Sequence, residues 1–248
     1  MAEHEILKNA PIEEALIDIR IKVKDDFAIQ QLQSLGEKVG KQYPEQKERL
    51  KWEQHIDFKK EEVPIHHRKK IMADGYIFVS EDKKQVFQAR IDGFTFSRLR
   101  PYMNWENLRD EASYLWTLYK EIISPEITRI AVRFINKIEI PFPLGNFNEY
   151  LIGSPIIPNE WPQGIASFFT RFVVYEQEVD AYAVIIQALE QGITENAIPI
   201  ILDIDVFKEK QDCFKDDAEA WHIIEALRNI KNRIFFSSIT EKTKELFL

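Results

Sequence analysis

The sequence predicts an α+β fold in which a mostly antiparallel sheet carries its helices on one face. Residues 128–141 alternate apolar and polar side chains, which is the pattern of a strand with one buried face. Two stretches, 104–123 and 216–235, place apolar residues three and four positions apart, as amphipathic helices do. Three closely spaced strand patterns precede each of these stretches, so we expect two β-meander-plus-long-helix halves.

The chain is expected to open with a strand and a helix. Isoleucines alternate with charged residues along 12–23, which predicts a strand with one solvent-exposed face. Asp26 is a candidate N-cap for a helix that runs to about residue 43 and is ended by Pro44.

A three-stranded meander, a long helix and the strand at 128–141 are expected next. The meander covers residues 70–80, 85–91 and 94–99, and the Asp92-Gly93 link is a strong hairpin signal. Asn104 can cap the helix, and the strand at 128–141 can return to the same sheet. The buried stripe of the helix is expected to contain Trp105, Leu108, Ala112, Leu115, Tyr119 and Ile122.

A proline-rich stretch divides the chain. Residues 142–164 contain four prolines, too many for a long helix or a central strand. We therefore expect an N-terminal α+β half at 1–141, a linker at 142–164, and a C-terminal half at 165–248 with the order β-β-β-α.

The C-terminal half contains three further strand patterns, at 165–175, 181–189 and 198–207. A second long helix is expected to begin at Asp216 or Asp217. Its buried positions are predicted to be Ala220, Ile223, Leu227, Ile230 and Ile234. Ser238 and Glu241 fit a capping box for a short final helix.

The two halves share an order of elements. Residues 70–123 and 165–235 both read as three strands followed by a long helix that has a tryptophan near its start. A structural duplication predicts two sheets, or one continuous sheet, with pseudo-two-fold symmetry. The alternative is that a meander followed by a helix is simply a common way to cover one apolar sheet face.

The composition of the chain limits the partners, cofactors and cellular compartment that we expect for this protein. A net charge of -8 and a pI near 5.3 make nucleic acid and anionic membranes improbable partners. Cys213 is the only cysteine, and no run of about 18 uncharged apolar residues occurs, so we expect a cytoplasmic protein without a membrane span. No glycine-rich phosphate-binding motif is present, and we expect no cofactor. Exposed strand edges make a homodimer a reasonable expectation.

A few residues are candidates for chemistry. Asp203 and Asp205 lie two apart on a strand and share a face, so they are weak candidates for a metal-dependent hydrolase, against the alternative of a solvated strand face. Asn136 is polar on the apolar face of its strand and either hydrogen-bonds a neighbouring segment or contacts a ligand. Arg133, on the polar face, is a further weak ligand candidate. We predict no metal site.

A ligand pocket is expected between the curved sheet and the helix at 217–235. Its aromatic lining is predicted to include Phe168, Phe172 and Tyr182, together with a few polar groups. This small-molecule-binding function is the alternative to the leading hypothesis, which is a non-enzymatic protein-binding role. Abundant aromatic residues, an acidic charge and the lack of catalytic motifs favour the leading hypothesis.

Four blocks of the sequence resemble a sporadically distributed family of prokaryotic proteins of about this length that has no assigned activity. The blocks are residues 9–23, 75–111, 132–141 and 235–247, so the resemblance spans nearly the whole chain. It implies no functional residue that could be transferred. Its patchy distribution is typical of genes that travel with defence or toxin–antitoxin loci, which implies an antitoxin, immunity partner or adaptor.

Overall fold

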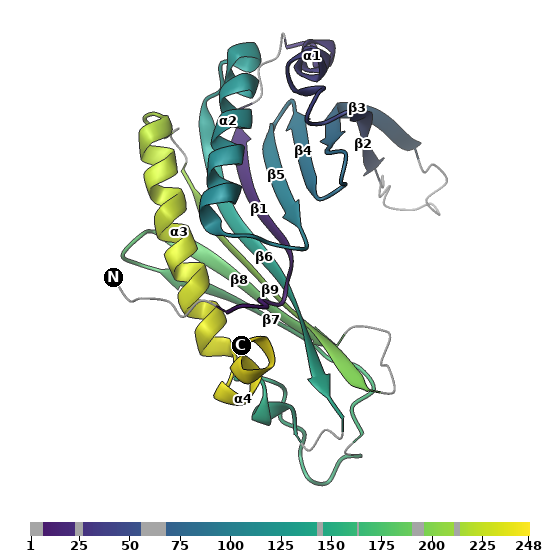
Figure 1. Cartoon of the computed structure of the whole chain (residues 1–248), viewed down its shortest axis with the longest axis vertical. Coiled ribbons are helices and arrows are strands. Elements are labelled where there is room, and N and C mark those ends of the chain that lie inside the picture. Colours follow the sequence, from purple (N-terminus) through teal and green to yellow (C-terminus); the bar gives the residue numbers. More distant parts are fainter. Residues whose placement is uncertain are drawn as a thin grey trace, which may run out of the picture.

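The structure is a computed structural model, which describes residues 7–22, 27–55, 68–142, 146–162, 164–189, 196–210 and 214–248. Within these residues the chain forms one nine-stranded antiparallel sheet that does not close, with the order β2-β3-β4-β5-β1-β6-β9-β8-β7. The long helices lie side by side on one face of the sheet (Figure 1). The expected α+β fold is confirmed.

The strands are β1 (Ile12–Ile21), β2 (Glu45–His55), β3 (Arg68–Val79), β4 (Gln85–Arg90), β5 (Gly93–Leu99), β6 (Ile127–Pro141), β7 (Phe169–Glu176), β8 (Ala181–Leu189) and β9 (Ala197–Glu209). The α-helices are α1 (Leu35–Val39), α2 (Trp105–Ile123), α3 (Asp217–Ser238) and α4 (Glu241–Lys244). Short 3-10 helices occupy Ile29–Ser34, Phe147–Glu149 and Glu245–Phe247. None of the helices described is long and apolar enough to cross a membrane.

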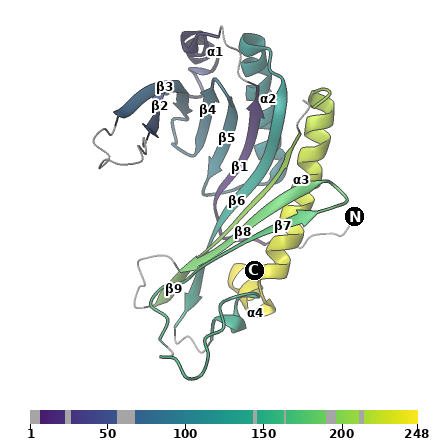
Figure 2. The same cartoon turned by 180° about the vertical axis from the view of Figure 1, so that it is seen from behind.

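The sheet has the topology that a duplication predicts. In the first half, β1 pairs with β5, the last strand of the meander that precedes α2. β6, which the sequence analysis placed at the end of the N-terminal half, pairs in the same way with β9, the last strand of the meander that precedes α3. By this topology the second half begins at β6. The two halves join where β1 pairs with β6, so their strand orders run outward in opposite directions from this seam. Figure 2 shows the sheet from the side opposite the helices.

The core lies between the sheet and the helices. On β6 the side chains of Ile130, Val132, Phe134, Ile138 and Ile140 are buried, as the alternation predicts. Under α2 a chain of aromatic contacts runs from the sheet into the helix, with Phe94 edge-on to Trp116 at 5.7 Å between ring centroids. Such rings bury large apolar areas, which is the main stabilising contribution to this layer.

Of the helix caps that the sequence predicts, two of the three that lie in the described residues are present in the structure. The Asn104 side chain accepts a hydrogen bond from the Asn107 N–H at the start of α2, and Asp216 accepts one from the Glu219 N–H at the start of α3. The expected Ser238 capping box is wrong. Thr240 caps α4, while Ser238 is the last residue of α3 and donates its hydroxyl to the Ile234 carbonyl.

Replacing Asp216 with alanine is expected to lower the free energy of unfolding by about 1 kcal/mol, because the first turn of α3 loses its hydrogen-bond acceptor. Urea denaturation of the two proteins measures this difference. Asp216→Ser keeps an acceptor oxygen and should stay within a few tenths of a kcal/mol of the wild type. Equal losses in both variants would show that the carboxylate charge, rather than the cap, stabilises the helix.

The region around the expected helix at 26–43 differs from the prediction. The 3-10 turn Ile29–Ser34 and the five-residue α1 replace the single long helix, and Asp26 lies outside the described residues. β2 then begins directly after Pro44, although its charged sequence gives only a weak strand pattern. The expected linker at 142–164 is in contact with the C-terminal helix α4. The Thr243 hydroxyl donates a hydrogen bond to the Tyr150 carbonyl.

Candidate functional site

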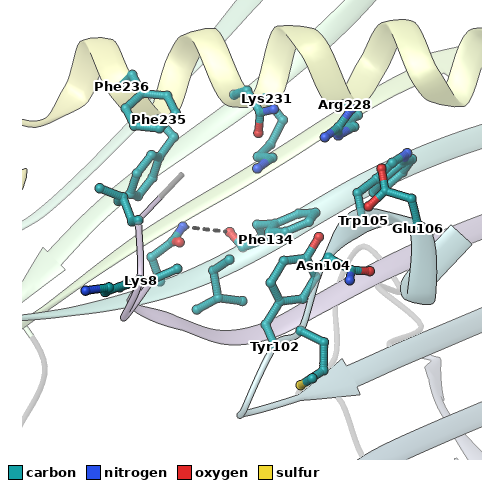
Figure 3. A pocket seen from close by; sticks show the side chains of 16 residues that line it. Lys8, Tyr102, Asn104, Trp105, Glu106, Phe134, Arg228, Lys231, Phe235 and Phe236 are labelled. Atoms are coloured by element: carbon teal, nitrogen blue, oxygen red, sulfur yellow. Dashed lines mark hydrogen bonds between the residues drawn. The ribbon is translucent and has the colours of Figure 1, made fainter. Parts of the chain in front are cut away.

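A cavity of about 320 Å³ lies between the helical layer and the sheet (Figure 3). Four segments surround it: the residues leading into β1, the segment leading into α2, the helix-facing side of β6, and the second half of α3. It therefore spans the seam between the two halves of the fold. Its position between sheet and α3 is where the sequence places a pocket, although different residues line it.

One wall of the cavity is a single face of α3. Arg228, Lys231, Asn232, Phe235 and Phe236 contribute to it, at separations of three, one, three and one residues. That spacing puts all five side chains on the same side of a helix. Figure 3 shows the Lys231 side chain extending from the helix towards Phe134 on the sheet.

Lys231 is the most unusual residue of this wall. It is only 7% exposed, and its Nζ lies 3.8 Å from the centre of the Phe134 ring. Burial, and secondarily the positive charge of Arg228, lower the pKa of the Lys231 amine from 10.5 to about 7. The aromatic face offsets part of the cost of burying an ammonium group. No carboxylate among the described residues forms an ion pair with it.

The opposite wall comes from β6 and from the segment before α2. Phe134 and Asn136 lie two apart and so project from the same face of β6. The ring of Tyr102 meets Phe134 edge-on, with 5.4 Å between centroids. Burial raises the pKa of Tyr102, so its hydroxyl keeps its proton at neutral pH. The Asn136 Nδ2 donates to the Leu202 carbonyl at 2.9 Å.

The rim of the cavity is held by contacts between α2 and α3. The Trp105 Nε1 donates to both carboxylate oxygens of Glu225, at 2.9 and 3.0 Å. Arg109 also donates to Glu225, at 3.3 Å, and the guanidinium of Arg228 lies 5.3 Å from the centre of the Trp105 ring. These contacts fix the indole at the mouth of the cavity and direct Arg228 alongside it.

The charges around the cavity are unbalanced. Among the described residues that line it, Lys8, Arg228 and Lys231 are basic, whereas Glu106 is the single carboxylate. Glu225, at the rim, lies 4.0 Å from the Arg228 guanidinium and offsets part of its charge. The remaining walls are largely aromatic and aliphatic. An anionic group would therefore find cations at the helix wall, while an apolar body would find aromatic rings.

In the first half of the fold, aromatic side chains of α2 occupy two of the positions that correspond to the cavity wall of α3. Counted from the N-caps Asn104 and Asp216, Arg228 stands where Trp116 stands in α2, and Lys231 stands where Tyr119 stands. Trp116 and Tyr119 are almost fully buried and stack on each other at 5.4 Å. Two large rings thus close the helix–sheet interface in one half, and two cations line a cavity in the other.

The paired aspartates lie on the face of the sheet opposite the helices. Arg133 donates from Nε to Asp203 Oδ1 at 2.9 Å and from Nη2 to Asp203 Oδ2 at 2.6 Å. Asp205 receives a hydrogen bond from Arg129 at 3.4 Å, and burial raises the pKa of Asp205. Guanidinium groups thus accompany both carboxylates, which is the arrangement of an ion-pair network.

Metal binding has no support in the part of the chain that the structure describes. There, no group of three or more His, Cys, Asp or Glu side chains could hold an ion. A cation placed beside Asp203 and Asp205 would also meet the positive charges of their arginine partners. The geometry does not favour the hydrolase alternative.

The three aromatic residues expected in the pocket are not in this cavity. Phe168 is half-buried and packs edge-on against Phe147 at 5.3 Å. Phe172 pairs with Ile185 across β7 and β8, and Tyr182 pairs with Tyr175. Because Phe172 and Tyr175 are three residues apart, Phe172 and Tyr182 project from opposite faces of the sheet and cannot line one cavity.

The sequence reasoning brought Asn136 to the cavity and missed Lys231. The buried stripe of α3 runs through Ala220, Ile224, Leu227, Lys231 and Phe235, at separations of four, three, four and four. Of the expected stripe, Ala220, Leu227 and Ile230 are buried, whereas Ile223 and Ile234 are half-buried. Lys231 was left out because lysine is assumed to face solvent. A lysine that continues a three-and-four spacing in a helix was the available signal.

Comparison with known protein families finds no family that matches this chain, and comparison with proteins of curated function finds no similar sequence.

Proposed function

We propose that this protein binds a small anionic molecule with an aromatic or branched aliphatic body in the cavity beneath α3. The observation that carries the proposal is the Lys231 amine, which is buried against Phe134 without a described carboxylate partner. Burying a charged amine is costly unless a partner compensates it. A carboxylate, sulfonate or phosphate on the ligand supplies that partner, and Arg228 adds a second cation at the mouth.

Three further features support an anionic, partly apolar ligand. The cavity volume of about 320 Å³ suits a small organic molecule. The rings of Tyr102, Trp105 and Phe134 offer apolar contact area on the side facing the two cations. The equivalent position under α2 is closed by rings, so the cavity is a specialised feature of one half of the fold.

The proposal is tested with two molecules of the same shape, 2-naphthoate and 2-naphthamide, by isothermal titration calorimetry. The naphthoate should bind at least about tenfold more tightly, because only the carboxylate pairs with Lys231. Lys231→Met should remove this preference. Lys22→Met alters a distant exposed lysine and should leave binding unchanged. Equal affinity for both molecules in the wild type would contradict the proposal.

Binding of 2-naphthoate should weaken as the pH rises above 7. The pKa of Lys231 is about 7 in the free protein, and a bound anion favours the protonated amine, so binding takes up a proton above that pH. The dissociation constant should therefore increase by up to about tenfold per pH unit from pH 7 to 9. Calorimetry in buffers of different ionisation enthalpy measures the proton uptake. A pH-independent affinity would exclude Lys231 as the anion partner.

A second candidate function is the protein-binding accessory role suggested by the sequence, as an antitoxin, immunity partner or adaptor. One observation favours it: Phe169, Tyr175 and Tyr182 are between 44% and 65% exposed on one end of the sheet. Exposed aromatic clusters often mark protein contacts. Co-expression with the products of adjacent genes, followed by sedimentation of the purified complex, tests this role. A protein that sediments without any of those products speaks against it.

A further inference from the structure

Among the residues whose side chains are described, β7 has more exposed apolar side chains than any other strand of the sheet. β7 is the last strand in the order, so its outer edge has no partner among the described strands. Phe169, Phe172, Val173, Val174 and Tyr175 are each between 44% and 65% exposed. Because they alternate between the two faces, both faces of β7 carry exposed apolar side chains. Figure 2 shows the position of β7 in the sheet.

The opposite edge of the same sheet is built differently. β2 carries Glu45, Lys47, Glu48, Arg49 and Lys51, and such charges discourage one sheet edge from pairing with another. Between residues 169 and 175, β7 has only the charge of Arg171, with no proline and no glycine. One edge is thus protected against strand pairing and the other is not.

The backbone of β7 presents a regular set of free groups at this edge. The Leu189 N–H donates to the Phe168 carbonyl at 3.1 Å, so even-numbered residues of β7 direct their backbone groups towards β8. The odd-numbered residues Phe169, Arg171, Val173 and Tyr175 consequently direct their N–H and C=O groups outward. These groups define where an added strand would bond.

We propose that β7 pairs with β7 of a second copy of this chain, antiparallel and about a two-fold axis at Phe172. In this register Arg171 faces Val173 of the other copy, and Phe169 faces Tyr175. Every outward-directed residue between 169 and 175 then has a partner, with two hydrogen bonds for each opposed pair. The two sheets become one continuous sheet.

The sequence of β7 matches itself in this register, which favours a second copy over an unrelated strand. Aromatic side chains face aromatic side chains at Phe169 and Tyr175, and Phe172 meets its own copy on the other face. No like charges are opposed. A shift that centres the pairing on Arg171 would instead place two arginines directly opposite each other, which is destabilising.

Cysteine cross-linking tests both the pairing and its register. In a Cys213→Ser background, Phe172→Cys should form a disulfide-linked dimer on mild oxidation, since residues paired at a two-fold axis have Cα atoms about 4.5 Å apart. Thr170→Cys is the matched control. Its two copies would lie about 14 Å apart in this register and should not cross-link. Cross-linking through residue 170 but not 172 would overturn the register.

Sedimentation of the full chain tests the assembly itself. The wild type should sediment at twice the 29.3 kDa chain mass, and Val173→Pro should sediment as a monomer, because proline removes an outward N–H. The thermal unfolding midpoint of this variant, extrapolated to low concentration, should match that of the wild type. Val174→Pro removes an N–H used by β8 and should lower that midpoint. A wild type that remains monomeric at high concentration overturns the proposal, whether or not another protein binds this edge.

Discussion

Lys231→Met should raise the free energy of unfolding by about 2–4 kcal/mol at pH 6, because the side chain is buried and methionine fills similar space without a charge. Between pH 7 and 10.5 the unfolded chain holds a proton on this amine that the folded chain lacks, so wild-type stability rises with pH. The advantage of the variant should therefore shrink by about 1.4 kcal/mol per pH unit above pH 7.

Chemical denaturation at pH 6, 7, 8 and 9 measures this difference. Lys22→Met, at an exposed lysine, serves as the control and should change stability little at every pH. A Lys231→Met advantage that does not vary with pH would show that the amine is not a buried base. A variant that is more stable but no longer binds 2-naphthoate would indicate that the lysine is retained for binding at the expense of stability.

Arg90→Met should lower the free energy of unfolding by about 3–5 kcal/mol, which is the largest loss we expect from a single substitution. The Arg90 side chain is 6% exposed and donates to Asp18 at 2.9 Å and to Asp92 at 3.0 Å. Burial tends to raise the pKa of Asp18, but Arg90 and the Thr95 hydroxyl outweigh it and hold the pKa below 3.8. Without Arg90, a largely buried carboxylate loses its main partner.

A double-mutant cycle with Asp18→Asn isolates the contribution of the pair. The double variant should be less destabilised than the sum of the two single variants. Since Asp18 has a lowered pKa in the folded protein, its pairing stabilises the fold above about pH 4, and that contribution is lost as the pH falls below it. Arg100→Met breaks an exposed pair with Glu13 and should cost less than about 1 kcal/mol. Similar losses at the two arginines would contradict the argument from burial.

The parts of the fold that follow local rules could be predicted from the sequence. Alternation identified β6, the Asp92-Gly93 turn identified the hairpin between β4 and β5, and Asn104 marked the start of α2. No strand was predicted at 45–51, because the charged residues of β2 resemble a solvated loop. Charged residues are common on edge strands, where they discourage pairing with another sheet. The same charges make β2 difficult to recognise as a strand from its sequence.

The predicted helix at 26–43 failed for a different reason. Gly36 lies so close to β2 that an added Cβ would come within 2.4 Å of the Gln46 side chain, and Gly40 ends α1. Glycine lowers helix propensity, so Gly36 and Gly40 disfavour a long helix here. The contact between Gly36 and Gln46 depends on the folded chain and could not be read from the local sequence pattern.

The candidate site was only partly accessible to sequence reasoning. A cavity between sheet and α3 agrees with the expectation, and Asn136 lines it. Lys231 and Arg228 were overlooked because they interrupt the apolar pattern of the helix, and Phe134 was assigned to the core alone. The cavity arises from the combination of four segments that meet only in the folded chain.

The pairing of β1 with β6 has a consequence for the origin of this chain. Each half consists of a leading strand, a meander and a helix, and the leading strands meet antiparallel at the centre of the sheet. A polypeptide of half the length could form the same sheet by pairing its leading strand with that of an identical subunit. Joining two such genes end to end would make the subunits covalently linked and free them to diverge. One descendant half could then keep its aromatic filling while the other opened a binding cavity.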